Sequence, residues 1–439
     1  MEQLENPETF AFDESHALYG PIRAMVADQF RDARTEPSLR VHPEDEMFQH
    51  SIAACPTPRF GRMAYFRGGL LILDALRQAA GWHDKPLTSL DRVLDFAAGY
   101  GRSTRFLAAL LPPERVWIAE ILPEAVAFQR AEYGVNSMQS SKEPADFRCD
   151  EKFDLIFVSS LFSHLPERTW GPWLERLHSL LAPSGVLAFS VHGETLMSAS
   201  HQMPAEGLFF LPSNEADSWD VADYGTSFVS ETFVSRVIEQ RLPCDNYVRL
   251  PKSLCFHQDL YIVRNAGQVD ENRRFLRGPF GHVDDIHLSN TQKRTYEAEG
   301  WVVDMDGGPS PQVLMKIGTE EYETITPTLD RPDLLDSLHL PNGEGLIPKG
   351  WTASFHLPAG VARPTTALTV AAKNPTSGKE FVLDLFPFRD RLSPTRVTSG
   401  GRRRLVDLLR TALQVQRESG WTKTVTLARE RWSKSNIRK

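Results

Sequence analysis

The sequence predicts an α/β domain built on a parallel sheet, followed by an all-β sandwich domain and a C-terminal helical tail. Three observations carry this prediction. Apolar runs alternate with helical periods from Tyr65 to about Arg264, which is typical of a parallel sheet with helices on both faces. From about residue 270, short β-branched runs are separated by turn residues, the rhythm of an antiparallel sandwich. After residue 400 the apolar spacing is helical again.

The chain is long enough for several domains. Its 439 residues correspond to roughly two to four domains of ordinary size. We divide it into an N-terminal covering segment (1–50, with a weak helix around Leu18–Arg34), the α/β domain (51–265), the sandwich (270–398) and the tail (400–439).

Composition and charge predict a cytoplasmic protein with free thiols. The four cysteines show no C-x-x-C spacing, and none stands beside a histidine, so we expect no structural zinc and no other metal site. The N-terminus is acidic, unlike a secretory signal, and no apolar run approaches the roughly 18–20 residues that span a bilayer. The acidic body also argues against nucleic acid as the main substrate, because phosphate contacts need clustered Lys and Arg.

The tail differs electrostatically from the rest of the chain. Residues 400–439 hold eleven Lys/Arg against three Asp/Glu, in a protein of net charge −8. The same segment contains two sets of apolar residues at helical spacing, which begin at Leu405 and at Trp421. Two interpretations stay open: a basic amphipathic helix that contacts the inner membrane surface or a protein partner, or a helix whose apolar stripe packs on the sandwich or on another subunit.

Five apolar runs predict the strands of the α/β domain. They are Arg92–Ala98, Arg115–Ile121, Phe153–Ser159, Gly185–His192 and a last one near Asp259–Val263. Helical periods between them cover Arg102–Leu111, Pro123–Tyr133 and Arg168–Leu181. In the sandwich the expected strands are Trp301–Met305, Val313–Ile317, Tyr322–Thr326, Trp351–Leu357, Thr365–Ala371 and Phe381–Phe386.

The most informative segment is Val93–Arg102, which reads VLDFAAGYGR. An apolar strand ends in an acid, small residues follow at alternate positions, and a helix begins, which is typical of a nucleotide-type site at the carboxyl edge of a parallel sheet. A dinucleotide fingerprint needs G-x-G-x-x-G, but the third place holds Thr104 when counted from Gly99. The spacing therefore disfavours a nicotinamide cofactor.

This segment resembles motif I of class I S-adenosylmethionine-dependent methyltransferases, which have a Rossmann-like sheet. The resemblance continues in order with Glu120 at the end of the second strand, the strand and loop Phe153–Pro166, and the connection Leu180–Leu187. It covers roughly residues 60–265. The resemblance implies S-adenosyl-L-methionine as cofactor and methyl transfer as the activity.

The resemblance also implies which residues bind the cofactor. Glu120 would accept bonds from the ribose hydroxyls, and Asp95 would lie near the methionine end. The full expected set is Asp95, Phe96, Ala97, Gly99, Gly101, Arg102, Glu120, Ile121, Ser159 and Ser160. Two positions depart from the family pattern, because Ala97 and Ser184 stand where glycines are usual. Since alanine tolerates a negative φ, we expect a slightly displaced cofactor at Ala97.

The acceptor is less well defined. His192 and His164 are the candidate catalytic bases, with Tyr224 a weaker one, and the stretch Glu194–Tyr224 is a candidate lid. For both histidines a purely structural role stays open. Two Gly-Trp pairs in the sandwich, at residues 300–301 and 350–351, suggest sugar stacking if exposed and ordinary core if buried.

Three classes of function remain open on these residues. The preferred one is methyl transfer to a hydroxyl-bearing acceptor, either a small molecule or a saccharide such as a surface-glycan precursor. The alternatives are N-methyl transfer to a small molecule or protein, and a non-catalytic scaffold that keeps the fold. The intact Asp95 and Glu120 pair disfavours the scaffold, and Ser159–Phe162 lacks an amino-directed tetrad.

Overall fold

A computed structural model describes most of the chain. The described residues are 10, 12–31, 33–198, 200–212, 222–243, 246–267, 269–290, 295–318, 320–338, 346–356 and 367–387. The predicted tail, its membrane or partner contact, and Cys244 therefore lie outside the described residues. Within the described ranges, no helix combines the length and hydropathy needed to cross a bilayer.

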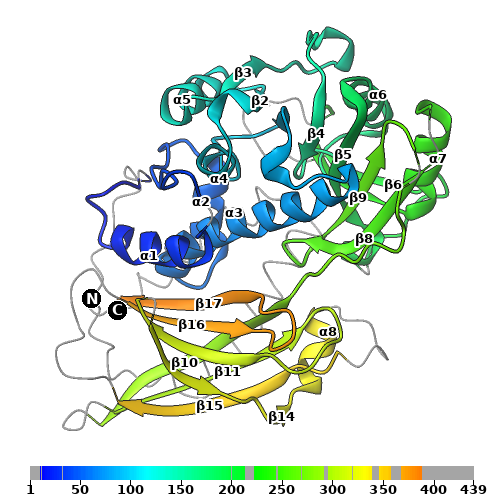
Figure 1. Cartoon of the computed structure of the whole chain (residues 1–439). Coiled ribbons are helices and arrows are strands. Elements are labelled where there is room, and N and C mark those ends of the chain that lie inside the picture. Colours follow the sequence, from blue (N-terminus) through cyan, green and yellow to red (C-terminus); the bar gives the residue numbers. More distant parts are fainter. Residues whose placement is uncertain are drawn as a thin grey trace, which may run out of the picture.

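A mixed sheet forms the centre of the α/β domain (Figure 1). Its strands in the described ranges are β1 Val93–Phe96, β2 Val116–Glu120, β3 Asn136–Gln139, β4 Phe153–Val158, β5 Leu181–Gly193, β6 Leu208–Pro212, β7 Gly225–Val229, β8 Tyr247–Leu254 and β9 Gln258–Arg264. The order β3-β2-β1-β4-β5 is parallel throughout. Because β2 and β4 lie on opposite sides of β1, a crevice is expected outside the carboxyl ends of β1 and β4.

Beyond β5 the sheet is antiparallel in part, which corrects the expectation of a parallel sheet. The last predicted strand is present as β9, but it runs antiparallel to β5, and β8 runs antiparallel to β9. Strand β5 also forks, because Val186–Val191 pair with β9 while His192 and Gly193 pair with β7. His192 therefore lies where the pairing of β5 with β9 ends and its pairing with β7 begins.

The helices of this half of the chain pack around the sheet and against one another. They are α1 Tyr19–Gln29, α2 Glu46–Ala54, α3 Pro58–Ala80, α4 Thr104–Leu110, α5 Pro123–Tyr133, α6 Glu167–Ser179 and α7 Glu231–Arg241. The long α3 begins with Pro58 after a Thr57 cap, whose hydroxyl accepts from the backbone N–H of Phe60. It packs closely on the motif segment, because a Cβ at Gly69 would lie 2.5 Å from the carbonyl oxygen of Arg102.

The sandwich consists of two four-stranded antiparallel sheets in the described ranges. One has the order β10-β11-β15-β14, with β10 Pro279–Asn290, β11 Thr295–Asp304, β14 Leu329–Asp330 and β15 Lys349–His356. The other has the order β13-β12-β16-β17, with β12 Gln312–Ile317, β13 Glu320–Ile325, β16 Ala367–Lys373 and β17 Glu380–Pro387. A short helix, α8 Leu335–Leu338, follows β14. Trp301 and Trp351 are both buried, so these residues belong to the sandwich core.

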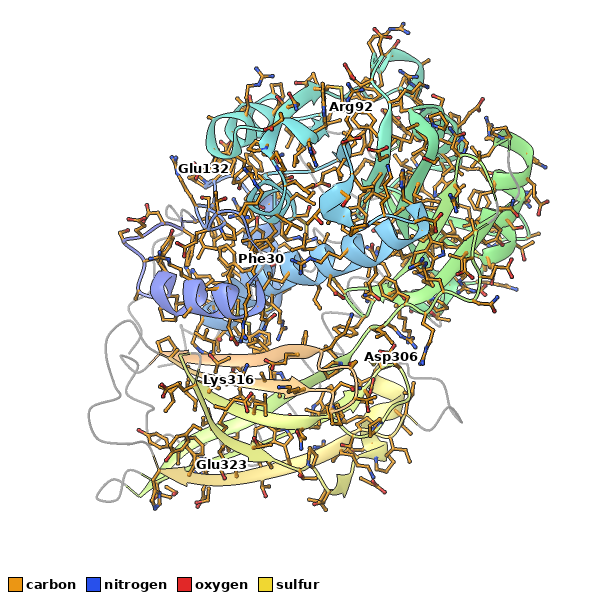
Figure 2. All side chains as sticks on the ribbon, viewed as in Figure 1. Phe30, Arg92, Glu132, Asp306, Lys316 and Glu323 are labelled. Atoms are coloured by element: carbon orange, nitrogen blue, oxygen red, sulfur yellow. The ribbon has the colours of Figure 1, made fainter. Side chains whose placement is uncertain are left out.

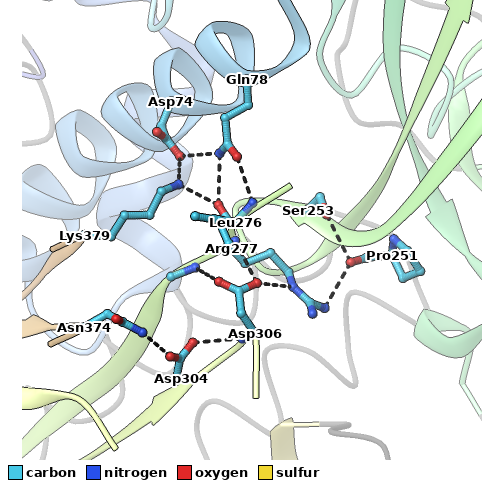
Figure 3. Close-up of polar contacts among 11 residues, drawn as sticks. Asp74, Gln78, Pro251, Ser253, Leu276, Arg277, Asp304, Asp306, Asn374 and Lys379 are labelled. Carbon is cyan, nitrogen blue, oxygen red and sulfur yellow. Dashed lines mark hydrogen bonds and ion pairs between the residues drawn. The ribbon is translucent and has the colours of Figure 1, made fainter. Parts of the chain in front are cut away.

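The sandwich packs against α1 and α3 of the N-terminal half (Figures 1 and 2). Lys316 of β12, labelled in Figure 2, forms ion pairs with Asp28 and with Glu380. In Figure 3, the Lys379 ammonium lies 2.6 Å from both Asp74 of α3 and the carbonyl oxygen of Leu276. These charged contacts fix the sandwich to the helices that border the α/β domain.

Candidate active site at the carboxyl edge of the sheet

Two buried carboxylates mark the carboxyl ends of β1 and β2. Oδ2 of Asp95 accepts hydrogen bonds from the hydroxyls of Ser103 at 2.7 Å and Thr104 at 2.9 Å. Burial raises the pKa of Asp95, and these hydroxyls and Arg102 act against that rise. Since Ser103 and Thr104 open α4, Asp95 joins the end of β1 to the start of the following helix.

Glu120 organises the backbone around the glycine turn. Its Oε2 accepts the N–H of Gly99 at 2.8 Å, and its Oε1 accepts the N–H groups of Ile121 and Leu122 at 2.7 and 3.1 Å. Burial raises the pKa of this carboxyl group, with a smaller contribution from Asp95, while the three N–H bonds lower it. Oε2 accepts only one of these bonds, so it retains acceptor capacity.

The turn itself has a left-handed backbone at three alternate positions, and this corrects the expectation for Ala97. Its φ is +57°, not negative, alongside φ values of +54° at Gly99 and +83° at Gly101. Alanine in this region costs roughly 1–2 kcal/mol. Ala97 thus adopts a conformation that favours glycine, so the backbone gives no reason for a displaced cofactor.

The two glycines have different roles. A Cβ at Gly99 would meet nothing within 4 Å, whereas one at Gly101 would lie 2.6 Å from the Tyr133 ring and 2.9 Å from Oε1 of Gln129. Gly99 therefore borders open space beside Glu120. Gly101 instead allows close packing of the turn on α5.

Three further residues that the sequence predicts at the cofactor site have different surroundings. The Phe96 ring packs on Trp173 and Phe147, so only its backbone can border the site. The guanidinium of Arg102 lies near Gly68 of α3. Ile121 contributes its N–H to Glu120, as described above.

After β4, the Ser159 hydroxyl oxygen is buried and has no hydrogen-bond partner among the described residues. Ser160 follows with a left-handed φ of +64°. Its backbone N–H donates to the hydroxyl of Ser190 on β5 at 2.9 Å.

The two candidate bases lie near each other but in different surroundings. The rings of His164 and His192 are 6.2 Å apart. Nδ1 of His164 lies 2.7 Å from the carbonyl oxygen of Gly225, and its ring stacks on Tyr224 at 4.8 Å. Burial, together with His257 and His164, holds the pKa of His192 well below its ordinary value.

The family comparison identifies this part of the chain. Residues 94–187 match a family model described as a methyltransferase domain. This range contains β1 through the start of β5, with both carboxylates and the glycine turn. The chain carries a class I S-adenosylmethionine-dependent methyltransferase domain. No curated protein matches the chain.

The methyltransferase domain is also similar to several solved structures, each at low sequence identity. A Burkholderia thailandensis 1,6-didemethyltoxoflavin N1-methyltransferase is 19% identical over 46% of this chain and 79% of that one, with a TM-score of 0.31. The N-methyltransferase NodS from Bradyrhizobium japonicum is 14% identical over 51% of this chain and all of that one, again with a TM-score of 0.31. A methyltransferase from Clostridium acetobutylicum is 14% identical over 46% and 92%, with a TM-score of 0.32.

The site fits S-adenosylmethionine. The cofactor carries a ribose diol, an ammonium, a carboxylate and a sulfonium, and the site offers carboxylates and backbone groups for these. Open space at Gly99 adjoins the Glu120 carboxylate, which can accept from ribose hydroxyls, and the buried Ser159 hydroxyl has no hydrogen-bond partner among the described residues. The methyltransferase domain therefore uses this cofactor, which supplies an electrophilic methyl group when bound.

Several site residues were not predicted from the sequence. Gln129 of α5 is fully buried and donates to the carbonyl oxygen of Gly99 at 2.7 Å. Tyr100 stacks on His42 at 4.7 Å, which brings the N-terminal segment onto the glycine turn. Gln258 of β9 contacts both Ser160 and His192. The only signal for Gln129 was its position on the predicted helix after the acid at 120.

Proposed function

We propose that the methyltransferase domain methylates a hydroxyl group of a small-molecule acceptor, with His164 as the general base. The observation that carries the proposal is the 2.7 Å contact between Nδ1 of His164 and the carbonyl oxygen of Gly225. A carbonyl oxygen only accepts, so Nδ1 carries the proton and Nε2 holds the basic lone pair.

His192 is the weaker candidate for this role. It is 1% exposed, against 8% for His164, and its lowered pKa makes it a poor proton acceptor. Its Nε2 also lies 3.2 Å from the side-chain nitrogen of Gln258. His164 is therefore the better-placed base.

The reaction balances with groups that the site provides. The acceptor oxygen forms a bond to the methyl carbon as the bond from that carbon to sulfur breaks. The hydroxyl proton passes to Nε2 of His164, and the Gly225 carbonyl stabilises the imidazolium through Nδ1–H. The protein otherwise orients the acceptor and excludes water, and such orientation supplies up to roughly 7–11 kcal/mol.

A saccharide is one class of acceptor within this proposal. The two sandwich tryptophans, Trp301 and Trp351, would have to be exposed to stack on a sugar, but both are buried. They therefore give no support to a saccharide acceptor. The segment Glu194–Tyr224 remains the predicted acceptor wall, and part of it forms β6 beside β7. N-methyl transfer remains the alternative, since a nitrogen acceptor with a free lone pair needs no base.

Turnover of His164→Ala tests the proposal. Transfer of labelled methyl groups to hydroxyl-bearing small molecules, saccharides, amines and protein fractions first identifies the acceptor. With a hydroxyl acceptor, His164→Ala should lose about 10²–10⁴ in kcat while cofactor affinity is unchanged. His356→Ala, an exposed histidine of the sandwich, is the matched control. Normal turnover in His164→Ala, or methylation of amines alone, would overturn the proposal.

A further inference from the structure

A chain of hydrogen bonds connects the loop after β4 to His192. It starts at the backbone N–H of Ser160, which donates to the Ser190 hydroxyl at 2.9 Å. The Ser190 hydroxyl lies 2.6 Å from Oε1 of Gln258. Nε2 of Gln258 lies 3.2 Å from Nε2 of His192.

Two contacts of Ser190 give the direction of the chain. Its oxygen accepts from the Ser160 N–H, which can only donate, and its own hydrogen is donated to Oε1 of Gln258, 2.6 Å away. The side-chain oxygen of Gln258 therefore faces Ser190, and its NH₂ group faces Ser160 and His192. Since NH₂ donates, Nε2 of His192 must accept. A neutral His192 then carries its proton on Nδ1, a buried atom for which the described residues provide no hydrogen-bond partner.

This arrangement matters because of the charges around His192. The ionisable groups facing it are His164 from the loop after β4 and His257 from the β8–β9 turn, while Tyr224 stacks on His164. Asp259, the next acid on β9, is paired with Arg249. A cation at His192 would repel a proton on His164, 6.2 Å away, and would also repel the cofactor's sulfonium.

We propose that Gln258 is a positioning residue of the methyltransferase site, which holds His192 in the neutral Nδ1–H form by donating to its Nε2. His192 then forms an uncharged wall, and His164 alone accepts the proton. The roles of the two histidines rest on the proposed function, whereas the tautomer of His192 does not.

The tautomer can be measured in the full-length protein without an acceptor. Nitrogen and carbon NMR of protein labelled in the histidine rings distinguishes Nδ1–H, Nε2–H and imidazolium forms, and a His192→Gln variant assigns the signal. We expect wild-type His192 to be Nδ1–H at pH 7. In Gln258→Glu, a carboxylate should accept from Nε2, so the signal should change to Nε2–H or imidazolium and titrate at a higher pH.

Two further variants complete the test. Gln240→Glu makes the same chemical change on the exposed face of α7 and should leave His192 unchanged. Gln258→Met keeps the volume without a donor and should give a mixture of tautomers. An Nε2–H or imidazolium signal in the wild type, or an unchanged Nδ1–H signal in both Gln258 variants, would overturn the proposal. Loss of the His164 role with the expected His192 signals would instead contradict only the proposed function.

Discussion

The ring of Phe256 packs on the ring of Phe280 with their centroids 4.8 Å apart. Phe256 lies in the β8–β9 turn, immediately before His257 and Gln258, whereas Phe280 belongs to β10 of the sandwich. Phe256 also contacts Phe381 of β17 at 5.4 Å. The sandwich thus contacts the chain directly next to residues that face His192.

The turn is held in a conformation that local preference disfavours. Cys255 and Phe256 of the turn, and Lys252 near the end of β8, have φ values between +52° and +60°, the left-handed region that costs roughly 1–2 kcal/mol for each such residue. The packing of Phe256 on the sandwich offsets part of this cost. The sandwich therefore stabilises the backbone that carries Gln258.

Phe256→Ala should lower both stability and turnover. Loss of a buried phenylalanine costs about 3–5 kcal/mol, and the lower end is expected here because Phe256 is only half-buried. Chemical denaturation measures the loss of stability. Steady-state kinetics measures the loss of kcat, and the cofactor affinity should be unchanged. Leu329→Ala, which removes a 62% exposed side chain of the sandwich, is the control. Wild-type kcat in Phe256→Ala would show that the sandwich does not influence the site.

Ala97→Gly should stabilise the protein. The change relieves the left-handed strain at a φ of +57° but adds freedom to the unfolded chain, for a net gain of about 1 kcal/mol or less. Denaturant unfolding of the two proteins under identical conditions measures this difference. A loss of stability in Ala97→Gly would contradict the backbone conformation described for the turn.

Gly99→Ala and Gly101→Ala form a matched pair at neighbouring left-handed positions. Both should lose roughly 1–2 kcal/mol to backbone strain, but only the new methyl at 101 would contact Tyr133 and Gln129. Gly101→Ala should therefore unfold more easily than Gly99→Ala. Conversely, Gly99→Ala places its methyl in the open space beside Glu120 and should weaken cofactor binding. Calorimetric titration together with unfolding curves separates the two effects, and identical behaviour of the pair would contradict the assigned roles.

His282 should make the protein less stable in mild acid. Burial lowers the pKa of this β10 residue to about 4; the Asp384 carboxylate acts against this shift, whereas Arg67 and Arg59 lower the pKa further. Because the unfolded pKa is near 6.5, the unfolded state binds more protons between about pH 6.5 and 4. The contribution of His282 is complete above pH 6.5, and up to about 1.4 kcal/mol should be lost per pH unit as the pH falls through this window.

The His282→Gln variant isolates this effect from other acid-sensitive groups. Comparing the free energy of unfolding at pH 7.5 and 5 in the two proteins should show a smaller loss in the variant. An equal loss in both would mean that His282 does not titrate differently in the folded protein.

Much of the methyltransferase domain could be predicted because its elements have strong local signals. Pro123–Tyr133 matches α5 at both ends, and the runs for β1, β2 and β4 end within two residues of the observed strands. These strands are largely buried and apolar; β2 ends at Glu120, and the small residues Ala97 and Ser159 directly follow β1 and β4. Their order and the acids at 95 and 120 were sufficient to indicate the cofactor.

Other features depend on tertiary contacts. The sequence did not reveal α3, because glycines and arginines interrupt its apolar spacing, nor β10, where histidine and aspartate alternate with apolar residues. The direction of β9 is set by its pairing with β5, and a single strand sequence carries no such information. Likewise, nothing near Gln258 in the chain indicates that Ser190 and His192 would face it.

The cofactor affinity of Glu120 variants tests the central claim most directly. Calorimetric titration of S-adenosylmethionine should give wild-type binding in the micromolar range, about −8 kcal/mol. Glu120→Ala should weaken it by roughly 1.5–3 kcal/mol, and Glu120→Gln, which keeps the size and one acceptor oxygen, should weaken it less. Glu114→Ala, an exposed glutamate just before β2, is the control and should bind like the wild type. Folded Glu120 variants with wild-type affinity would contradict the assignment of this carboxylate to the cofactor.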